Sequence, residues 1–326
     1  MVEIGKDILT AKIFLEKGEL VAIPTETVYG LAANALDPIA VAKIFEAKER
    51  PTFDPLIVHT HSLKEVQRFV TDIHPNLLKL AETFWPGPLT LLLPKKEIIP
   101  SLVTSGLDRV GVRIPNHLMT LELLSQLSFP LAAPSANPFG YISPTSPNHV
   151  QKQLGEKIPY ILDGGNCEVG LESTIVGEEN GEENGEIIIY RLGGLSVDDI
   201  EKVIGKVSVQ LNQSSNPKAP GQLKSHYAPK KPFYLGDLET LQKQLFGKKM
   251  GVLVFGNDLP NLNNAFIKNL SPSNNYSEAA VNLFAFLREL DEADIDIIIS
   301  HYLPEIGLGL AINDRLKRAA SEFSEK

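Results

Sequence analysis

Short apolar runs separated by polar turns dominate the first part of the chain. Such runs are typical of buried strands, and they occupy residues 20–23, 55–59, 89–93, 110–114 and 130–133. Between two of them, Val41, Ile44 and Phe45 recur at the spacing of one helix face. Strands that alternate with amphipathic helices predict an α/β fold.

Capping and turn residues place further elements. Residues 1–19 resemble an amphipathic helix that Gly18 ends, and residues 62–65 form a capping box for a helix that continues to about Val70. Asn184-Gly185 is a strong hairpin signal, so residues 173–176 and 186–191 are predicted to pair as antiparallel strands.

A change of composition divides the chain. Residues 211–232 are polar, contain four prolines and lack apolar periodicity, which is typical of a linker. Strand-like and helical segments alternate again after it. We therefore expect a first domain over residues 1–210, a linker over 211–232, and a smaller, parallel, Rossmann-like α/β domain over 233–326.

Two cations lie close together near the end of a predicted helix. Asp37 can cap this helix and Pro38 suits its first turn, which places Lys48 on or near the buried face of the last turn. Pro51 favours an extended conformation for Arg50. The two cations could therefore hold an anion in a common space, although a lysine in a last turn can also simply complement the helix dipole.

Other polar residues stand within or just after predicted strands. Arg113 interrupts an apolar strand, so it needs a partner, either an ion pair or a carboxylate bound in a cavity. Ser135 and Asn137 follow a strand end, where hydroxyl and amide groups can bind phosphate or ribose, or can form a turn. Ser143 lies in a loop before a helix N-terminus that suits anions.

Composition narrows the class of protein. The formal net charge of −9 opposes direct, tight, nonspecific binding of nucleic acid, because phosphate contacts dominate that affinity. Cys167 is the only cysteine, so an internal disulfide and a cysteine-based zinc site are excluded. No apolar run approaches the length of a membrane span and no signal peptide is recognisable, so we expect a cytoplasmic protein with no membrane partner.

Ordered motifs connect these features to a known family. PTETVYGL, KERP, PLIVH, PGPLTLLL, VRIP, SAN, SPT and DGGNCEVGLESTIV occur in this order, followed by HYAP and GLGLAINDRL. Together they resemble the YrdC-like family of L-threonylcarbamoyladenylate synthases in its long, two-domain form. Asp54 stands where the family usually has Asn, and Pro138-Phe139-Gly140 replaces the Ser-Gly after SAN.

The resemblance implies a twisted, open-sheet catalytic domain with a central cavity. It also implies a nucleotidyltransferase that converts L-threonine, bicarbonate or carbon dioxide, and ATP to L-threonylcarbamoyladenylate and pyrophosphate, with Mg²⁺ on the ATP phosphates and no metal bound by protein side chains alone. The product would pass to a downstream enzyme that transfers the threonylcarbamoyl group to adenosine in tRNA.

The same resemblance assigns roles to individual residues. Lys48 and Arg50 would be catalytic and serve the phosphates. The residues implied to bind threonine are Thr27, His59, Arg113, Ala133 and Ser173. The residues implied to bind ATP are Arg50, Asp54, Arg109, Ser135, Asn137, Ser143, Arg191 and Tyr227.

Tyr227 is unusual because it lies within the predicted linker, next to His226. Pro229 follows shortly afterwards and restricts the backbone. We expect residues 211–232 to act as a lid that brings Tyr227 to the nucleotide and excludes water from the labile carbamate. The alternative is a solvated connector whose tyrosine packs at the domain boundary.

Three other functions compete with this hypothesis. A carbamoyl-adenylate-forming relative would share several motifs but should carry zinc-finger cysteines, which this sequence lacks. A nonenzymatic double-stranded RNA-binding module is disfavoured by the acidic charge balance. A regulatory ATP-sensing protein would bind ATP and threonine without releasing pyrophosphate.

Overall fold

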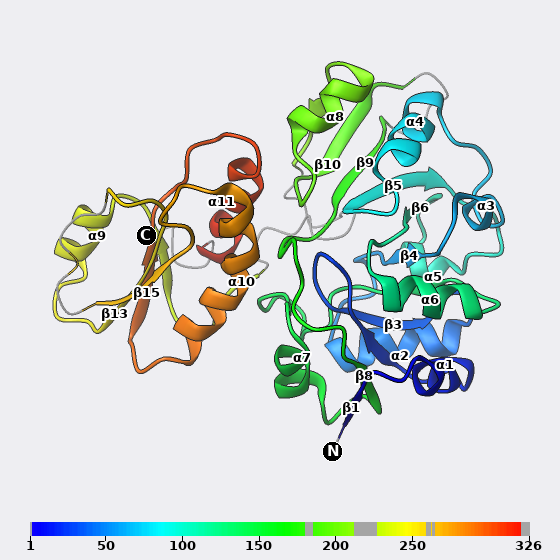
Figure 1. The fold of residues 1–326 in the computed structure, drawn as a ribbon, viewed down its shortest axis with the longest axis horizontal. Coiled ribbons are helices and arrows are strands. Elements are labelled where there is room, and N and C mark those ends of the chain that lie inside the picture. Colours follow the sequence, from blue (N-terminus) through cyan, green and yellow to red (C-terminus); the bar gives the residue numbers. More distant parts are fainter. Residues whose placement is uncertain (1, 180–184, 212–226, 259–261, 263–264, 321–326) are drawn as a thin grey trace.

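The chain folds into two α/β units, each built around its own sheet (Figure 1). The computed structural model describes residues 2–179, 185–211, 227–258, 262 and 265–320. The larger unit precedes the predicted linker and the smaller one follows it. The predicted α/β class is therefore confirmed for both units.

A mixed sheet forms the centre of the larger unit. Among the described residues its strand order is β1-β8-β2-β3-β7-β4-β6-β5-β9-β10-β11. The strands span Glu3–Gly5 (β1), Val21–Ile23 (β2), Gly30–Asn34 (β3), Ile57–His59 (β4), Leu89–Pro94 (β5), Arg109–Arg113 (β6), Leu131–Ala132 (β7), Tyr160–Leu162 (β8), Thr174–Glu178 (β9), Ile187–Arg191 (β10) and Ser208–Val209 (β11).

Helices cover this sheet and complete its apolar core. They span Ile8–Glu16 (α1), Pro38–Lys48 (α2), Leu63–Val66 (α3), Pro75–Phe84 (α4), Ser101–Thr104 (α5), Leu118–Gln126 (α6), Pro147–Leu154 (α7) and Val197–Ile204 (α8). In α2, Asp37 accepts a hydrogen bond from Ile39 N and Pro38 occupies the first turn, as predicted. Val41, Ile44 and Phe45 pack into the core.

Two local predictions need correction. Residues 1–19 do not form one helix, because β1 pairs in parallel with β8 before Asp7 caps α1 with hydrogen bonds from Leu9 N and Thr10 N. The helix after Ser62 is also shorter than expected, since α3 ends at Val66. In both cases pairing and packing with distant residues override the local helical pattern.

The hairpin prediction is confirmed. β9 and β10 pair antiparallel, with Ile187 opposite Glu178. Asn184 itself lies outside the described residues. The hairpin matters for the site because its open end brings the start of β9 next to the end of β10.

The smaller unit has a parallel sheet in the order β12-β15-β13-β14. Its strands span Phe233–Leu235 (β12), Met250–Val254 (β13), Phe266–Asn269 (β14) and Ile297–Ser300 (β15), and its helices span Leu238–Gln244 (α9), Tyr276–Glu292 (α10) and Gly309–Ala320 (α11). The alternation of strands and helices that the sequence predicts after the linker is therefore present.

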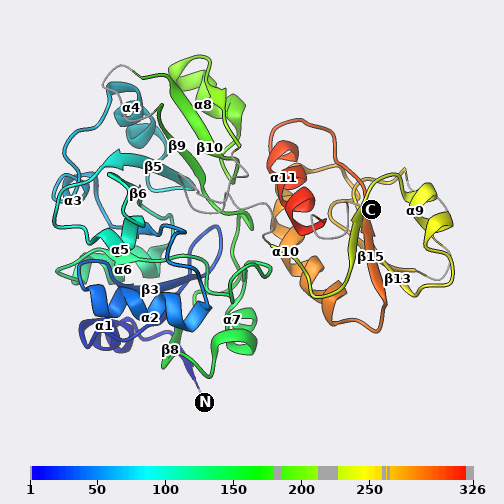
Figure 2. The same ribbon diagram turned by 180° about the vertical axis from the view of Figure 1, so that it is seen from behind.

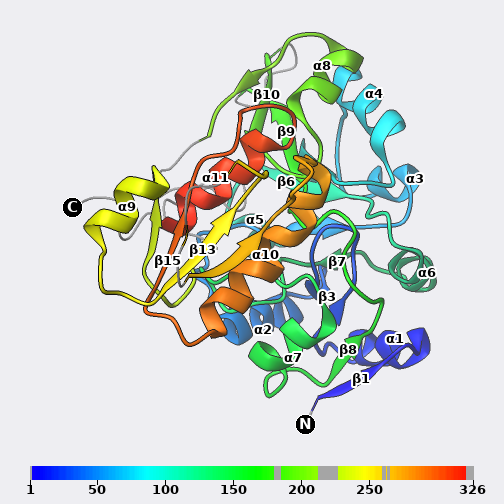
Figure 3. The same ribbon diagram turned by 60° about the vertical axis from the view of Figure 1, so that its left-hand side comes forward.

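The helices α10 and α11 lie on the side of the smaller sheet that faces the larger unit, whereas α9 lies on the far side (Figures 1 and 2). Side chains cross between the units: Tyr141 Oη donates to Asp291 Oδ2 at 2.6 Å, and Lys152 pairs with Glu292 at 2.7 Å. Figure 3 shows the smaller unit turned toward the viewer, with α10 and α11 in front of the larger unit. The smaller unit is therefore docked through one helical layer.

Candidate active site

A cavity opens where several strand ends of the larger unit meet. Its lining comes from separate stretches of the chain: Val28, Arg50, Pro55, Ile57, His59, Arg113, Ala133, Pro134, Ser135, Glu172, Ser173, Arg191 and Tyr227.

Three buried arginines give the cavity a positive wall. Arg50 follows α2, whereas Arg113 and Arg191 end β6 and β10, and each is no more than 8% exposed. Burial lowers the pKa of Arg50 and of Arg191 from its ordinary value. Guanidinium groups bind carboxylates and phosphates through paired hydrogen bonds, so the cavity is suited to anionic ligands.

The orientation of Arg50 is set by the loop that follows it. Its Nε donates to Asp54 O at 3.1 Å and its Nη2 donates to Pro55 O at 2.8 Å. The Asp54 carboxylate lies 2.9 Å from Nη2 and is fully buried. Asp54 therefore orients Arg50 toward the cavity without itself lining it.

His59 contributes a neutral hydrogen-bonding group. Burial lowers its pKa to about 3, and the charge of Arg113 acts in the same direction. Its Nδ1 lies 3.2 Å from Ile57 O, which assigns the ring proton to Nδ1 because a carbonyl oxygen can only accept. The other ring nitrogen, Nε2, is then an acceptor for a ligand hydroxyl or ammonium group.

Lys48 reaches the loop after β7 instead of the cavity. Its ammonium group lies 2.5 Å from Ser135 O and 2.5 Å from Asn137 O, and the residue is 1% exposed. Burial, followed by the charge of Arg50, holds the pKa of Lys48 well below its ordinary value. The side chain thus joins α2 to the segment that carries Ser135 and Asn137.

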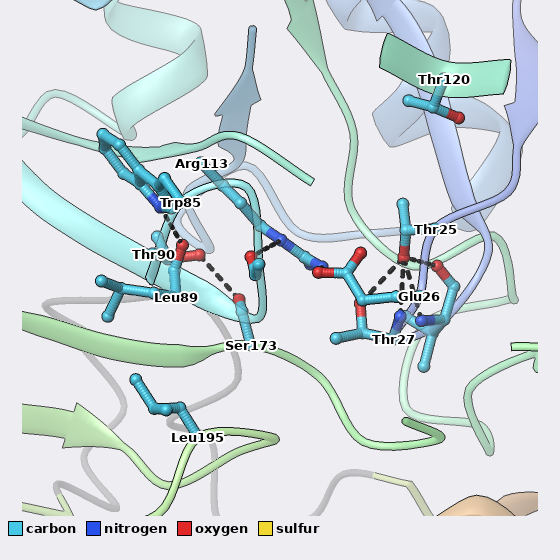
Figure 4. A network of polar contacts seen from close by, with 12 residues as sticks. Thr25, Glu26, Thr27, Trp85, Leu89, Thr90, Arg113, Thr120, Ser173 and Leu195 are labelled. Carbon is cyan, nitrogen blue, oxygen red and sulfur yellow. Dashed lines mark hydrogen bonds and ion pairs between the residues drawn. The ribbon is translucent and has the colours of Figure 1, made fainter. Parts of the chain in front are cut away.

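The turn after β2 places a second polar cluster beside Arg113 (Figure 4). Thr25 Oγ1 lies 2.9 Å from Thr27 Oγ1 and donates to Val28 O at 2.6 Å. Glu26 Oε1 lies 2.8 Å from Arg113 Nη2, and both residues are about 5% exposed. The carboxylate therefore orients the guanidinium at the edge of the cavity, which fulfils the predicted need of Arg113 for a partner.

Ser173 stands at the open end of the β9–β10 hairpin. Its hydroxyl lies 2.7 Å from Thr90 Oγ1 and accepts a hydrogen bond from Arg191 Nη2 at 3.0 Å. Figure 4 shows the Thr90 contact beside Arg113. Ser173 therefore joins the Arg113 and Arg191 sides of the cavity.

Tyr227 completes the wall next to the smaller unit. It is 1% exposed and stacks on Phe284 of α10, with 5.6 Å between the ring centroids. The next residue, Ala228, donates its backbone N–H to Gly140 O at 2.9 Å. Tyr227 thus lines the cavity as predicted. Residues 212–226 of the predicted lid, which include His226, lie outside the described residues.

The structure brings most sequence-predicted site residues to this cavity. Those that line it are Arg50, His59, Arg113, Ala133, Ser135, Ser173, Arg191 and Tyr227. Lys48, Asp54 and Ser143 contact lining residues from behind, and Thr27 and Asn137 neighbour Val28 and Ser135 in sequence. Arg109 stands at the opposite end of β6 from Arg113, where its Nη1 donates to Glu178 O at 2.6 Å.

Sequence reasoning missed two carboxylates. Glu26 pairs with Arg113, and Glu172 lines the cavity and binds Ser143 and Arg315. Each is next to a predicted residue, Thr27 or Ser173, so position offered a signal for both. Arg315 belongs to the GLGLAINDRL motif, but nothing in the sequence places it beside Glu172, which is far from it along the chain.

The side chains that line the cavity do not favour the binding of a metal ion by the protein alone. The cavity lining contains one carboxylate, Glu172, against three guanidinium groups. Among the described residues no cluster of three or more histidine, cysteine, aspartate or glutamate side chains could hold a metal ion. A divalent cation would therefore need oxygens from a ligand such as a polyphosphate.

Within the described part of the chain, none of the helices has the length and apolar character that crossing a membrane requires.

Two family descriptions together match almost the whole chain. The family described as "Telomere recombination" matches residues 13–193. The family described as "Threonylcarbamoyl-AMP synthase, C-terminal domain" matches residues 195–321. The boundary between the two matches falls after β10.

Curated relatives are similar over nearly their full lengths. A threonylcarbamoyl-AMP synthase of Pyrococcus abyssi is 40% identical, with 94% of this chain and 92% of the relative covered. A protein of the same name from Bacillus subtilis is 37% identical, with 96% and 92% covered.

Solved structures agree. A crystal structure of P. abyssi Sua5 complexed with L-threonine superposes with a TM-score of 0.89 at 38% identity, and covers 98% of this chain and 97% of that one. Full-length HypF superposes with a TM-score of 0.51 at 22% identity over 58% of this chain, which shows a shared fold.

Proposed function

The chain belongs to the Sua5 and YrdC family of threonylcarbamoyl-AMP synthases, and we propose that its cavity binds L-threonine and ATP side by side and joins them through a carbamate. The observation that carries this proposal is the convergence of three buried arginines from three separate elements on one cavity that also presents a neutral histidine.

Threonine fits the part of the cavity between β4 and β6. Arg113, oriented by Glu26, would bind the carboxylate, and the register of the two strands places His59 directly beside it. His59 Nε2 would accept a hydrogen bond from the hydroxyl group. Thr27, Ala133 and Ser173 would complete the threonine site.

ATP fits the side formed by Arg50, Ser135, Arg191 and Tyr227. Arg50 and Arg191 would bind phosphate oxygens and stabilise the charge that develops during transfer. Lys48 would act through the loop that it holds, and Asp54, Asn137 and Ser143 would support the same half. For Arg109 the structure offers no contact with the cavity lining.

The reaction requires positioning more than covalent catalysis. The neutral amino nitrogen of threonine bonds to the carbon of bicarbonate or carbon dioxide; water leaves when bicarbonate is the source, and a proton leaves the nitrogen when carbon dioxide is. A carbamate oxygen then attacks the α-phosphorus, the bond to the β-phosphate oxygen breaks, and pyrophosphate departs. Mg²⁺ would enter with ATP and neutralise phosphate charge. The buried cavity walls would limit hydrolysis of the carbamate.

The activated product would pass to a downstream enzyme that modifies adenosine in tRNA. We propose that the reaction takes place in the cytoplasm, where ATP and tRNA are both present.

The proposed function is tested by measuring pyrophosphate release with one component omitted at a time. Release should require threonine, bicarbonate, ATP and Mg²⁺ together. Serine should be about 10- to 200-fold less efficient because it lacks a methyl group, and valine should be about 10⁴-fold less efficient because it leaves a buried hydrogen-bonding group unpaired. Equal release with serine, or release without an amino acid, would contradict the assignment.

A further inference from the structure

A network of buried charges crosses from the smaller unit to the cavity wall. Arg315 of α11 is 0% exposed. Its Nε donates to Glu172 Oε2 at 2.9 Å, its Nη2 to Leu192 O at 2.7 Å, and its Nη1 to Asp314 Oδ2 at 2.6 Å. A buried arginine is costly without partners, and here each of its three nitrogens has one. Two of the three partners belong to the larger unit.

Glu172 transmits this contact to the proposed nucleotide side. Its other carboxylate oxygen, Oε1, accepts a hydrogen bond from Ser143 Oγ at 2.5 Å, and Ser143 is 0% exposed. Glu172 lines the cavity, whereas Arg315 does not. Because Arg315 donates to one oxygen and Ser143 to the other, the arginine determines where the carboxylate stands and so where the serine hydroxyl points.

Arg315 also supports Tyr227. Its guanidinium carbon lies 5.0 Å from the centroid of the Tyr227 ring, and Phe284 of α10 stacks on the same ring. The ring is therefore held by two side chains of the smaller unit. Arg315 thus contacts two cavity-lining residues, Glu172 and Tyr227, from behind the wall.

We propose that Arg315 is a positioning residue of the nucleotide side of the site, which acts through Glu172 and Tyr227 and makes the smaller unit an integral part of that site. The inference rests on the proposed function, because it takes ATP as the ligand near Ser143 and Tyr227. Threonine binding should depend on Arg315 much less, since Arg113 and Glu26 are oriented within the larger unit alone.

The test compares the affinities for two ligands in the full-length chain. Dissociation constants for ATP with Mg²⁺ and for L-threonine are measured by calorimetry, together with the melting temperature, for the wild type, Arg315→Met and Arg315→Lys. Arg315→Met should weaken ATP binding at least 10-fold and leave threonine binding within about 3-fold. The ATP affinity of Arg315→Lys should lie between those of the wild type and Arg315→Met, since lysine keeps the charge but cannot donate the paired hydrogen bonds of a guanidinium group.

Tyr141→Phe is the matched control. It removes the hydrogen bond to Asp291 across the same boundary but keeps the ring, and Tyr141 is not part of the cavity lining. Its affinities for both ligands should equal those of the wild type, whatever its melting temperature. If Tyr141→Phe and Arg315→Met weaken ATP binding equally, docking in general and not Arg315 is responsible, and the proposal is overturned.

Glu172→Gln provides a second variant of nearly unchanged shape, which keeps the proposal testable if Arg315→Met does not fold. It should reproduce the selective loss of ATP affinity. Relative to the wild type, the double variant Glu172→Gln with Arg315→Lys should lose less ATP-binding free energy than the two separate losses combined, because the two residues act as a unit. Fully independent losses, or equal losses for ATP and threonine, would overturn the proposal.

The proposed function and this inference can fail separately. A wild-type protein that binds threonine but not ATP would refute both of them. If the wild type binds both ligands and Arg315→Met leaves both affinities unchanged, the inference alone is refuted.

Discussion

Lys48 and Arg50 are close in sequence, yet their side chains reach different parts of the site. Arg50 lines the cavity, whereas Lys48 ends on the carbonyl groups of Ser135 and Asn137. Arg50 is therefore placed to contact a ligand, whereas Lys48 holds the loop that carries Ser135 into the cavity lining.

Arg50→Ala should lower kcat/KM by about 10²–10³, equivalent to about 2–4 kcal/mol of transition-state stabilisation, because the variant removes a preorganised positive charge. The melting temperature should also fall, because the variant removes the ion pair of the buried Asp54 carboxylate with Arg50. Pyrophosphate release and a far-UV melting curve measure both quantities. A variant that turns over at the wild-type rate would place the phosphates away from Arg50.

Lys48→Ala should produce a similar loss of rate and in addition lower the free energy of unfolding by about 1–3 kcal/mol, because it leaves two buried carbonyl oxygens without their donor. Lys157→Met is the control, since Lys157 also donates to a backbone carbonyl, Ala47 O, but is partly exposed and outside the cavity lining. If Lys48→Ala behaves like this control in both assays, the lysine serves only the end of α2.

His59 should make the stability of the protein depend on pH. The pKa of His59 is about 3 in the folded chain, against an ordinary value of 6.5, so between these values the unfolded chain binds more protons. Stability is therefore highest above pH 6.5 and falls as the pH decreases below it. The expected loss from this one residue between pH 7.0 and 5.5 is about 1 kcal/mol.

Urea unfolding of the wild type and His59→Gln at the two pH values measures this contribution. The variant should lose less stability than the wild type over the same interval. Burial also lowers the pKa of His149, to about 4, so part of the wild-type slope should persist in the variant. Identical slopes for the two proteins would show that His59 is not the titrating group.

At the scale of elements, the loop before β9 contacts α10 so closely that it requires glycine. Gly170 has a φ of +75°, and a Cβ there would lie 2.4 Å from Ala280 O and 2.5 Å from Val281 Cα. These are backbone atoms or atoms fixed to the backbone, so they cannot move aside cheaply. The same loop carries Glu172 and Ser173 into the cavity.

Gly170→Ala should therefore destabilise the chain by about 1–3 kcal/mol and reduce ATP affinity, because it pushes the loop away from α10. Gly205→Ala is the control: its φ is +83°, but a Cβ there would meet nothing within 4 Å. The control isolates backbone strain from the clash. Equal melting temperatures and equal ATP affinities for the two variants would show that the close approach to α10 is unimportant.

At the scale of the whole molecule, the smaller unit supports the cavity wall from behind. Tyr227 of the predicted linker lines the cavity, and Phe284 of α10 and Arg315 of α11 contact its ring. The larger unit nevertheless contains the residues proposed to bind threonine. The two units are thus expected to contribute unequally to the two substrates.

A chain that ends at Val209 should retain threonine binding but lose pyrophosphate release severely, by about 10²-fold or more, since it lacks Tyr227 and leaves Glu172 without Arg315. Calorimetry with threonine and a turnover assay measure the two effects. Normal turnover of the shortened chain would contradict an essential role for the second unit.

Local features of the sequence predicted much of the fold and many of the residues around the cavity. Apolar runs predicted the central strands, Asn184-Gly185 predicted the β9–β10 hairpin, and Asp37 with Pro38 predicted the start of α2. Ordered motifs indicated most of the residues that line the cavity. These features are local, since periodicity, capping and turn chemistry act over a few residues.

Which side chains meet depends on the three-dimensional fold. It split the first nineteen residues between β1 and α1, directed Lys48 to a loop, and placed Arg109 at the end of β6 opposite the site. It also joined Glu172 to Arg315, which lie 143 positions apart. Contacts of this kind depend on strand order and on docking between units, and no local pattern encodes either of them.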